Sequence, residues 1–403
     1  MVGFLYKGLK PRLSGVFHTP QPQARGNGGH SAAPDLAYAT SLNPGNRPTI
    51  DSVAPGFSPE TQLTQKVGAS APYRFIISLF LLTLLLLSQP LHAQDHSNFF
   101  PILGGQRAGT SAYTFLKIGV GARALGMGGA YVAIANDATT LFWNPAGLVQ
   151  IDEKRSMTAD HNEWVAGIQH ENLGIVWQFG GIYGIGISAS ALHTDPMEIT
   201  TEYQPGGTGA YFNYGDVMAG LSFAMKMTDR FSFGVTGKLV DEQLAELHMV
   251  NTLFDLGTYY YTGFQKLRFA VSLVNFGTPA APKGEYTYTD INDVQQTESY
   301  ADFAPPTIFR LGIANEWLNS PHAQFTTSVQ LNHPVDNAEN ISCGAEFSLK
   351  EMLYLRGGYQ SNMDAETWSV GFGIHLAVLQ VDYAYTDMRD LNNAQRFSLG
   401  WAF

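Results

Sequence analysis

The sequence predicts an all-β transmembrane protein, a closed antiparallel outer-membrane β-barrel of about fourteen strands with a small N-terminal hatch in its lumen. Three observations predict this fold: an unusual composition, a series of alternating segments of strand length, and charges confined to one face of those segments. Of 403 residues, 45% are apolar and 12% aromatic, but only 14% are charged, and 42 are glycine. Soluble domains carry about 25% charged residues. A mean hydropathy of -0.07 excludes a helical protein with several membrane spans, which needs repeated apolar runs of about 20 residues.

The charge balance and the single cysteine exclude several classes of function. Asp and Glu number 34 against 23 Lys and Arg, giving a net charge of -11, so we expect no nucleic-acid partner. Cys343 alone supports neither an internal disulfide framework nor a cysteine-based metal cluster. The histidines are scattered and no Gly-x-Ser-x-Gly motif occurs. We therefore expect no enzymatic activity, no cofactor and no bound metal.

One apolar run, residues 75–88, has the properties of a signal peptide. As a helix it would be about 21 Å long, shorter than the roughly 30 Å hydrocarbon core of a bilayer. Arg74 precedes it, and Pro90 and the small-residue site ending at Ala93 follow it. This order predicts a secretory signal peptide over 71–93, cleaved before Gln94. The alternative is a short inner-membrane anchor.

Residues 1–70 are rich in Pro, Gly, Ser, Asn and Gln and show no periodicity, so we expect them to be disordered. A signal peptide normally begins the chain, and no methionine occurs between Met1 and Met127. Our hypothesis is that 1–70 is an extension from a start site assigned too far upstream. The exported chain would then comprise an N-terminal segment and hatch over 94–153 and a barrel over 154–403.

The barrel is predicted from segments of about ten residues separated by turn signals. Some connections are very short, as at 228–230, 319–321 and 349–352, and others are long and polar, notably 195–212 and 279–305. Short turns at one end and long loops at the other are typical of outer-membrane barrels. The candidate strands are 154–160, 166–179, 182–194, 211–227, 230–242, 250–262, 264–276, 306–318, 322–334, 338–349, 352–361, 366–376, 378–388 and 394–403.

These segments alternate between an apolar and a polar face. A soluble β-sandwich also alternates, but its polar face is densely charged, whereas here that face is mostly Ser, Thr, Gly, Ala and Gln. A lysine or arginine facing lipid at mid-bilayer costs about 2–4 kcal/mol, so a membrane barrel must direct its charges inward. The charges predicted to face the lumen are Lys226, Lys238, Arg268, Arg310, Glu316, Glu346, Arg356, Asp382 and Arg396.

The last strand ends in an aromatic residue. Leu399, Trp401 and Phe403 share its apolar face. A terminal aromatic on an alternating strand resembles the insertion signal of bacterial outer-membrane barrels. We therefore expect the barrel-assembly machinery to be a partner and outer-membrane lipid to surround the folded chain.

Residues 112–150 differ from the strand region. Gly119-x-Gly121-x-x-Ala124 is a weak dinucleotide fingerprint, but no alternating helices follow to build a parallel sheet. Compact packing is the better interpretation, because the small residues at 126–130 let backbones approach closely. A short helix over 138–143, capped by Asn136 or Asp137 and ended by Asn144-Pro145, would fit inside the barrel lumen.

This segment resembles the N-terminal signature of the PorV/PorQ family, whose architecture is similar to that of FadL-type outer-membrane transporters. The sharpest parts are 122–128 (ARALGMG) and 144–148 (NPAGL), and the resemblance extends through Arg356–Gln360 to Phe403. It implies a fourteen-stranded barrel and a hatch motif formed by Asn144, Pro145 and Ala146. It also implies a role in type IX secretion, with secretion components or secreted cargo as partners. The alternative is FadL-like passage of hydrophobic small molecules.

The lumen-facing arginines admit two interpretations. They form part of a network of paired charges that holds the hatch in place, or they attract the carboxylate or phosphate head of an amphipathic ligand. For the second interpretation the candidates are Arg268, Arg310 and Arg356. The excess acidic residues then lie mainly in loops such as 285–302, which would face the cell surface and offer a site for a partner protein.

Overall fold

The computed structural model describes residues 109–403. The extension predicted over 1–70 and the signal peptide predicted over 71–93 lie outside the described residues, as does the start of the N-terminal segment at 94–108. None of the helices between residues 109 and 403 is long and apolar enough to cross a bilayer.

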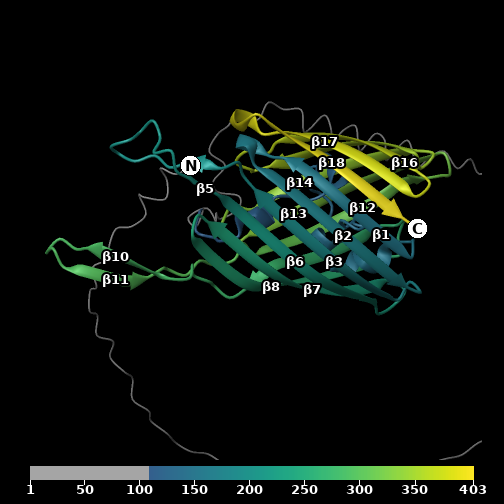
Figure 1. Cartoon of the computed structure of the whole chain (residues 1–403). Coiled ribbons are helices and arrows are strands. Elements are labelled where there is room, and N and C mark those ends of the chain that lie inside the picture. Colours follow the sequence, from purple (N-terminus) through teal and green to yellow (C-terminus); the bar gives the residue numbers. More distant parts are fainter. Residues whose placement is uncertain (1–108) are drawn as a thin grey trace, which may run out of the picture. The chain divides into compact units, whose positions relative to one another are not determined.

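Fourteen antiparallel strands form a closed barrel, as the alternation predicts (Figure 1). Each strand pairs with its neighbours along the barrel sheet, and the first barrel strand closes the circle by pairing with the last. Every predicted strand has its counterpart among them, with bounds that differ by a few residues. The strands are β1 (Arg155–Glu163), β2 (Gln169–Phe179), β3 (Tyr183–His193), β6 (Tyr214–Lys226), β7 (Phe231–Leu244), β8 (Leu247–Tyr261), β9 (Arg268–Gly277), β12 (Ile308–Asn319), β13 (Ala323–Pro334), β14 (Asn340–Leu349), β15 (Leu353–Ser361), β16 (Trp368–Leu376), β17 (Leu379–Asp387) and β18 (Asn393–Ala402).

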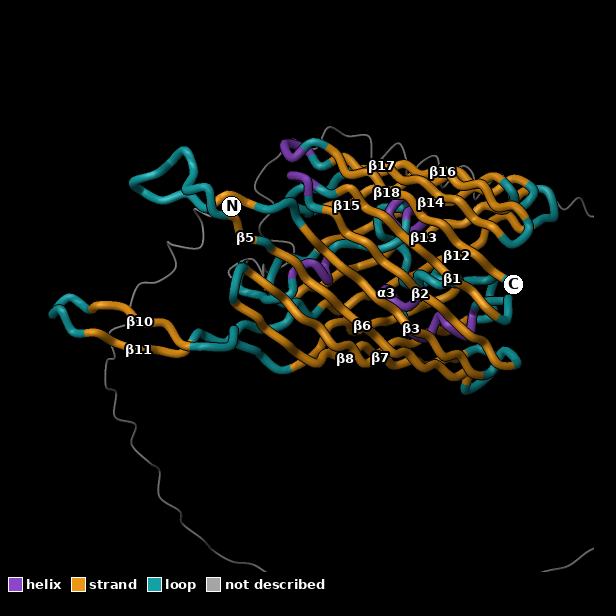
Figure 2. The backbone as a smooth tube through the Cα atoms, viewed as in Figure 1, coloured by secondary structure: helices purple, strands orange, loops and turns teal. Residues whose placement is uncertain are grey.

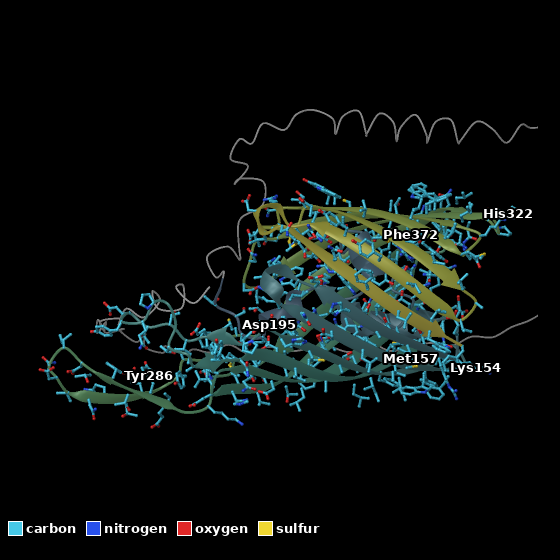
Figure 3. The ribbon with its side chains drawn as sticks, turned by 45° about the horizontal axis from the view of Figure 1, so that its top comes forward. Lys154, Met157, Asp195, Tyr286, His322 and Phe372 are labelled. Carbon is cyan, nitrogen blue, oxygen red and sulfur yellow. The ribbon has the colours of Figure 1, made fainter. Side chains whose placement is uncertain are left out.

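The two ends of the barrel differ in the length of their connections. Lys154 and His322 lie at the end with short turns, and Asp195 and Tyr286 lie at the end with long loops (Figure 3). Each long loop contains a small two-stranded sheet: β4 (Met197–Glu198) with β5 (Tyr211–Phe212), and β10 (Glu285–Thr289) with β11 (Gln295–Ser299). The sequence did not predict β4, β10 or β11, and it placed residues 211 and 212 at the start of the next barrel strand. In outer-membrane barrels the long loops are extracellular and the short turns periplasmic.

The outer wall of the barrel is apolar and the inner wall is polar. Leu221 is 63% exposed and points outward, while the next residue, Ser222, is buried in the lumen. Leu355 and Arg356 show the same division, with Leu355 59% exposed and the arginine buried. A soluble monomer rarely exposes so large an apolar surface. The chain is therefore an outer-membrane β-barrel with lipid around its outer wall.

Residues 109–153, called the hatch from here on, fold inside the barrel as short helical turns (Figure 2). The predicted helix over 138–143 is shorter than expected, because the α-helical turn begins at Thr140. It ends at Trp143, before Asn144-Pro145, as predicted. Two further one-turn helices, η4 (Val165–Gly167) and η5 (Arg389–Leu391), lie in connections between strands. The hatch elements are η2 (Thr114–Lys117), α2 (Ala122–Gly126), α3 (Thr140–Trp143) and η3 (Pro145–Gln150).

The hatch packs directly against the barrel wall through glycines. A Cβ atom at Gly126 would lie 3.0 Å from the Cα atom of Gly371 on β16. Gly128, whose φ is 63°, lies against Gly358 on β15, and a Cβ at Gly358 would collide with the Gly128 backbone nitrogen. The prediction that the small residues of this segment allow close backbone approach is confirmed.

Candidate functional site: the hatch within the barrel lumen

The Asn-Pro-Ala motif joins the hatch to the wall. The Asn144 amide group donates hydrogen bonds to the Val132 carbonyl of the hatch at 3.2 Å and to the Thr258 carbonyl of β8 at 3.1 Å. Its Oδ1 atom accepts one from the Ala146 N–H at 3.1 Å, which caps the η3 turn begun by Pro145. All three motif residues are fully or almost fully buried. This motif therefore holds the hatch on the strands of one side of the barrel.

Glycines on the facing strands make room for the motif. A Cβ at Gly257 of β8 would collide with the Asn144 side chain, and a Cβ at Gly234 of β7 would collide with the Pro145 backbone. These glycines lie on the lumen-facing parity of their strands. The wall is thus shaped to receive Asn144 and Pro145.

A charged network holds the opposite side of the hatch. Arg123 of α2 forms two hydrogen bonds of 2.9 Å with the Glu346 carboxylate of β14. Arg356 of β15 bonds the same carboxylate at 2.7 Å and Asp382 of β17 at 2.5 Å. Arg123 also contacts Asp137 of the hatch at 2.9 Å. Because two arginines share one buried carboxylate, the hatch and the strands β14, β15 and β17 form one network.

The surroundings of Arg123 keep it charged and keep its neighbour Tyr131 protonated. Burial alone would lower the pKa of Arg123, but Glu346, Tyr131 and Asp137 hold it well above its usual value. Burial raises the pKa of the Tyr131 phenol well above its usual range. Tyr131 therefore donates its hydroxyl hydrogen to Asp137, at 2.5 Å. In the hatch, Arg123 and Tyr131 are thus the donors and the Asp137 carboxylate is the acceptor.

Hydrogen bonds from two wall residues also hold the hatch near the short-turn end of the barrel. Arg268 of β9 donates a hydrogen bond of 2.8 Å to the Ala133 carbonyl of the hatch and forms an ion pair with Glu316 of β12. The Tyr259 hydroxyl donates to the same Ala133 carbonyl at 2.6 Å. Arg268 is therefore engaged within the protein.

A β-bulge places a third buried pair. The register between β8 and β9 shifts at Asp255, and Asn275 on β9 adopts a φ of 59°. This geometry lets Asp255 accept from the Asn275 N–H at 2.8 Å and lie 2.7 Å from the Lys238 ammonium group. Asp255 and Lys238 are both almost completely buried. The bulge directs the Asp255 carboxylate toward Lys238. Without this carboxylate, Lys238 would be a buried charge without an acidic partner.

Arg310 of β12 differs from the other two candidate arginines. It forms no ion pair with any residue between 109 and 403, and its Nη1 atom has no hydrogen-bond partner there, although the residue is only 7% exposed. Its guanidinium lies over the Trp143 ring of the hatch, 4.8 Å from the centroid. The surrounding residues include Phe115, Phe142 and Met218. Of Arg268, Arg310 and Arg356, only Arg310 has no acidic partner among residues 109–403.

The free space in the lumen is unevenly distributed. The cavity beside Arg310 has a volume of about 20 Å³, room for little more than a water molecule. A larger polar cavity of about 530 Å³ lies near the short-turn end, where Lys154 and Lys226 line it together with hatch residues such as Asn136. Hatch residues therefore line both cavities.

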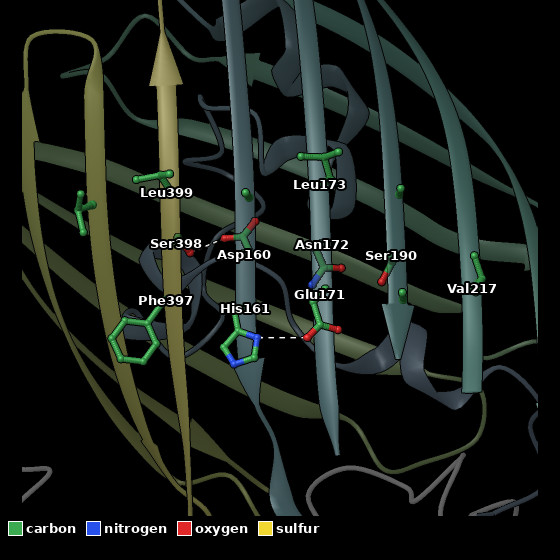
Figure 4. A pocket seen from close by; sticks show the side chains of 14 residues that line it. Asp160, His161, Glu171, Asn172, Leu173, Ser190, Val217, Phe397, Ser398 and Leu399 are labelled. Atoms are coloured by element: carbon green, nitrogen blue, oxygen red, sulfur yellow. Dashed lines mark hydrogen bonds and ion pairs between the residues drawn. The ribbon is translucent and has the colours of Figure 1, made fainter. Parts of the chain in front are cut away.

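A further hollow lies in the outer wall, not in the lumen. This groove, of about 660 Å³, runs over β1, β2, β3 and β18 (Figure 4). Its apolar contacts include Leu173 and Leu399, and the His161–Glu171 contact of 3.2 Å lies at one end. Since the groove belongs to the lipid-facing wall, acyl chains of the outer membrane are its expected contacts.

The terminal residues take part in barrel closure. Phe403 and Arg155 exchange two backbone hydrogen bonds of 2.9 Å, and the Arg155 guanidinium lies 5.5 Å from the centre of the Phe403 ring. Leu399, Trp401 and Phe403 are each about half exposed on the outer wall. The predicted insertion signal is thus lipid-facing and accessible.

Sequence reasoning placed the charges of the wall inside the lumen but missed their partners in the hatch. Arg123 stood within the quoted signature without a role, and Asp137 was predicted only as a helix cap. Asp137 does accept a hydrogen bond from the Thr139 N–H at 2.9 Å, but its second carboxylate oxygen binds Arg123 and Tyr131. The signal that could have identified the role of Arg123 was its positive charge in a segment of otherwise small and apolar residues.

Residues 104–252 match the family model described as type IX secretion system protein PorV. This match confirms the resemblance to the PorV/PorQ family over that part of the chain. The search of curated proteins found no match. Among solved structures, the *Ralstonia pickettii* toluene transporter TbuX is similar at 11% identity, with a TM-score of 0.48, covering 71% of this chain and 98% of that one. A *Pseudomonas putida* toluene transporter, TodX, is similar at 13% identity, with a TM-score of 0.48, covering 70% and 96%.

Proposed function

We propose that this outer-membrane barrel serves in type IX secretion or in the handling of proteins at the cell surface. The observation that carries the proposal is the match of residues 104–252 to the PorV family model, which includes the hatch and the first strands. Its partners would be secretion components or secreted cargo, and its working surface would be the long-loop end. The protein has no catalytic role in this proposal.

The state of the lumen supports this function over that of an open pore. Hydrogen bonds and ion pairs hold the hatch on both sides, through Asn144 on β8 and through Arg123 on β14. In this proposal, a hatch so connected keeps the barrel from acting as an open pore. A protein whose lumen is blocked can still bind partners through its exposed loops.

Export and assembly follow from the same proposal. The segment at 71–93 would direct the chain across the inner membrane and be removed before Gln94. The barrel-assembly machinery would then recognise the last strand through Phe403. Both steps can be followed by N-terminal sequencing of the mature protein and by its recovery in the outer-membrane fraction.

The test is a deletion strain assayed for two activities. If the proposal holds, cargo proteins fail to appear at the cell surface or in the medium, while uptake of a labelled fatty acid is unchanged. Normal cargo secretion together with reduced fatty-acid uptake would overturn it. Restoring the intact gene must restore the lost activity.

One observation favours a second function, passage of amphipathic small molecules. Among the residues that the structure describes, Arg310 is a buried guanidinium without an ion pair, and it lies among aromatic and aliphatic side chains. Its cavity of about 20 Å³ would have to open to admit an acyl chain. Arg310→Glu should then reduce fatty-acid uptake without loss of the folded barrel. Arg356→Glu is an unsuitable comparison, because Arg356 supports the hatch network; the matched control is Arg230→Glu in an exposed turn. Unchanged uptake in Arg310→Glu would exclude this function.

A further inference from the structure

The β10–β11 hairpin extends beyond the long-loop end of the barrel as an independent two-stranded sheet (Figure 1). Thr287 pairs with Thr297 and Tyr286 pairs with Glu298, and within the described chain no third strand pairs with either side. All of β11 and nearly all of β10 are exposed. The hairpin therefore presents two strand edges to the outside of the cell.

The hairpin is held in shape by its own side chains. Tyr286 and Tyr288 stack at 5.9 Å, and their hydroxyls donate to the Glu298 carboxylate across the sheet at 3.1 and 2.9 Å. At the tip, Asp290 accepts hydrogen bonds from the N–H groups of Val294 and Asn292 at 3.0 and 2.8 Å. These bonds lower the pKa of Asp290, so it stays ionised and keeps the turn formed. A two-stranded hairpin is only marginally stable alone, and these contacts preorganise it.

The edges lack the features by which proteins usually block edge pairing. Segment 285–299 contains no lysine, no arginine and no proline. The Asp290 N–H donates to the Val294 carbonyl at 2.9 Å, which sets the alternation of hydrogen-bonded pairs along the hairpin. Because hydrogen-bonded and non-hydrogen-bonded pairs alternate, Thr287 and Thr297 form a non-hydrogen-bonded pair. Their backbone N–H and C=O groups therefore point away from the hairpin. These groups are free to pair with another strand.

The charge around the hairpin indicates which kind of partner strand would bind to it. Lys283 is the single basic residue between 283 and 302. The neighbouring long loop, 195–212, contains acidic residues and no lysine or arginine, and it lies at the same end of the barrel (Figure 3). The acidic residues of the two loops are Asp195, Glu198, Glu202, Glu285, Asp290, Asp293, Glu298 and Asp302.

We propose that the β10–β11 hairpin binds an extended, basic segment of a partner protein, which adds to the hairpin as a third strand. Backbone hydrogen bonds at Thr287 or Thr297 would supply affinity, and the acidic side chains would select lysine or arginine. The inference rests on the proposed function, since it names the partner chemistry of the working surface at the cell exterior.

The binding test uses the purified full-length barrel in detergent micelles and a labelled peptide of alternating lysine and threonine. An alternating glutamate and threonine peptide, and a lysine–threonine peptide interrupted by proline, are the comparison probes. We expect the basic peptide to bind, binding to weaken with salt, and both comparison peptides to bind at least about tenfold more weakly. Equal binding of the acidic and basic peptides, or no binding of the basic one, overturns the inference.

Variants locate the site. The double variant T287P/T297P removes the outward N–H groups without removing a bond inside the hairpin, and it should weaken basic-peptide binding about tenfold. T287A/T297A keeps those N–H groups and should bind as the unmodified protein does. E285Q/D302N should weaken binding and reduce its salt dependence. Full binding by T287P/T297P would place the peptide elsewhere and overturn the inference.

The same variants, expressed in the deletion strain, separate this inference from the proposed function. Loss of cargo display on deletion, with loss again in T287P/T297P, supports both. Loss on deletion with full display in T287P/T297P leaves the proposed function standing and overturns the inference. Normal display in the deletion strain overturns the proposed function.

Discussion

The guanidinium group of Arg123 in the hatch and the carboxylate of Glu346 on β14 form a bidentate pair, joined by two hydrogen bonds of 2.9 Å. The two residues are 223 positions apart in the sequence. Bidentate arginine–carboxylate pairs fix orientation as well as distance. This pair therefore helps to fix how the hatch sits across the lumen.

We predict that Arg123→Ala releases part of the hatch. The change leaves Asp137 without its cationic partner and removes one of the two arginines at Glu346, a loss of about 3–5 kcal/mol for a buried pair. In planar lipid bilayers the unmodified barrel should be closed and Arg123→Ala should conduct ions. Arg230→Ala, in an exposed turn, is the control. A closed Arg123→Ala barrel would mean that other contacts suffice to hold the hatch.

Adjacent glycines on β15 give a matched test of hatch packing. Gly358→Ala places a methyl group against the Gly128 backbone and should lower the free energy of unfolding by about 1–3 kcal/mol. Gly357 has no atom within 4 Å of its would-be Cβ, so Gly357→Ala should change stability little. Denaturant unfolding in detergent measures both. Equal effects would show that strand propensity, and not hatch contact, determines the result.

Asn144→Ala should loosen the other side of the hatch. It leaves the buried Val132 and Thr258 carbonyls without their donor, at a cost of about 1–3 kcal/mol. Limited proteolysis of the folded barrel should then cut the hatch faster, while Gln296→Ala in the exposed hairpin should leave its cleavage rate unchanged. Unaltered protection in Asn144→Ala would contradict the anchoring role of the motif.

Phe403→Ala should reduce assembly more than it reduces the stability of barrels already formed. The ring is 49% exposed on the outer wall, and its loss removes the terminal aromatic as well as the contact with Arg155. The amount of heat-modifiable protein in the outer-membrane fraction measures assembly. Tyr359→Ala removes an aromatic that is 56% exposed on β15 and serves as the control. Equal assembly of the two variants would remove the special role of the C-terminal residue.

The strand region was predictable because each strand repeats the same local rule. Side chains alternate between lipid and lumen, so apolar and polar residues alternate in the sequence, and even Lys238 and Arg356 could be assigned to the lumen from parity alone. The β10–β11 hairpin escaped prediction because nearly all of its residues are exposed on both faces, so burial imposes no alternation of apolar and polar residues on its sequence.

The sequence could not show which charged side chains contact one another inside the lumen. Parity places Arg268, Arg310 and Arg356 on the same wall and makes them equivalent candidates for an anionic ligand. In the folded barrel, two of them have acidic partners and Arg310 has the Trp143 ring instead. Which charge meets which depends on strand register, on the bulge at Asp255 and on the path of the hatch.

The sequence by itself determined that this chain forms a lipid-embedded barrel with a small-residue segment at its N-terminal side, because alternation and composition are local properties of each segment. Only the tertiary structure decided how the segment is joined to the wall and which buried charges lack an acidic partner. Those properties arise where residues distant in sequence meet, as Arg123 meets Glu346 only after the sheet has closed between β1 and β18.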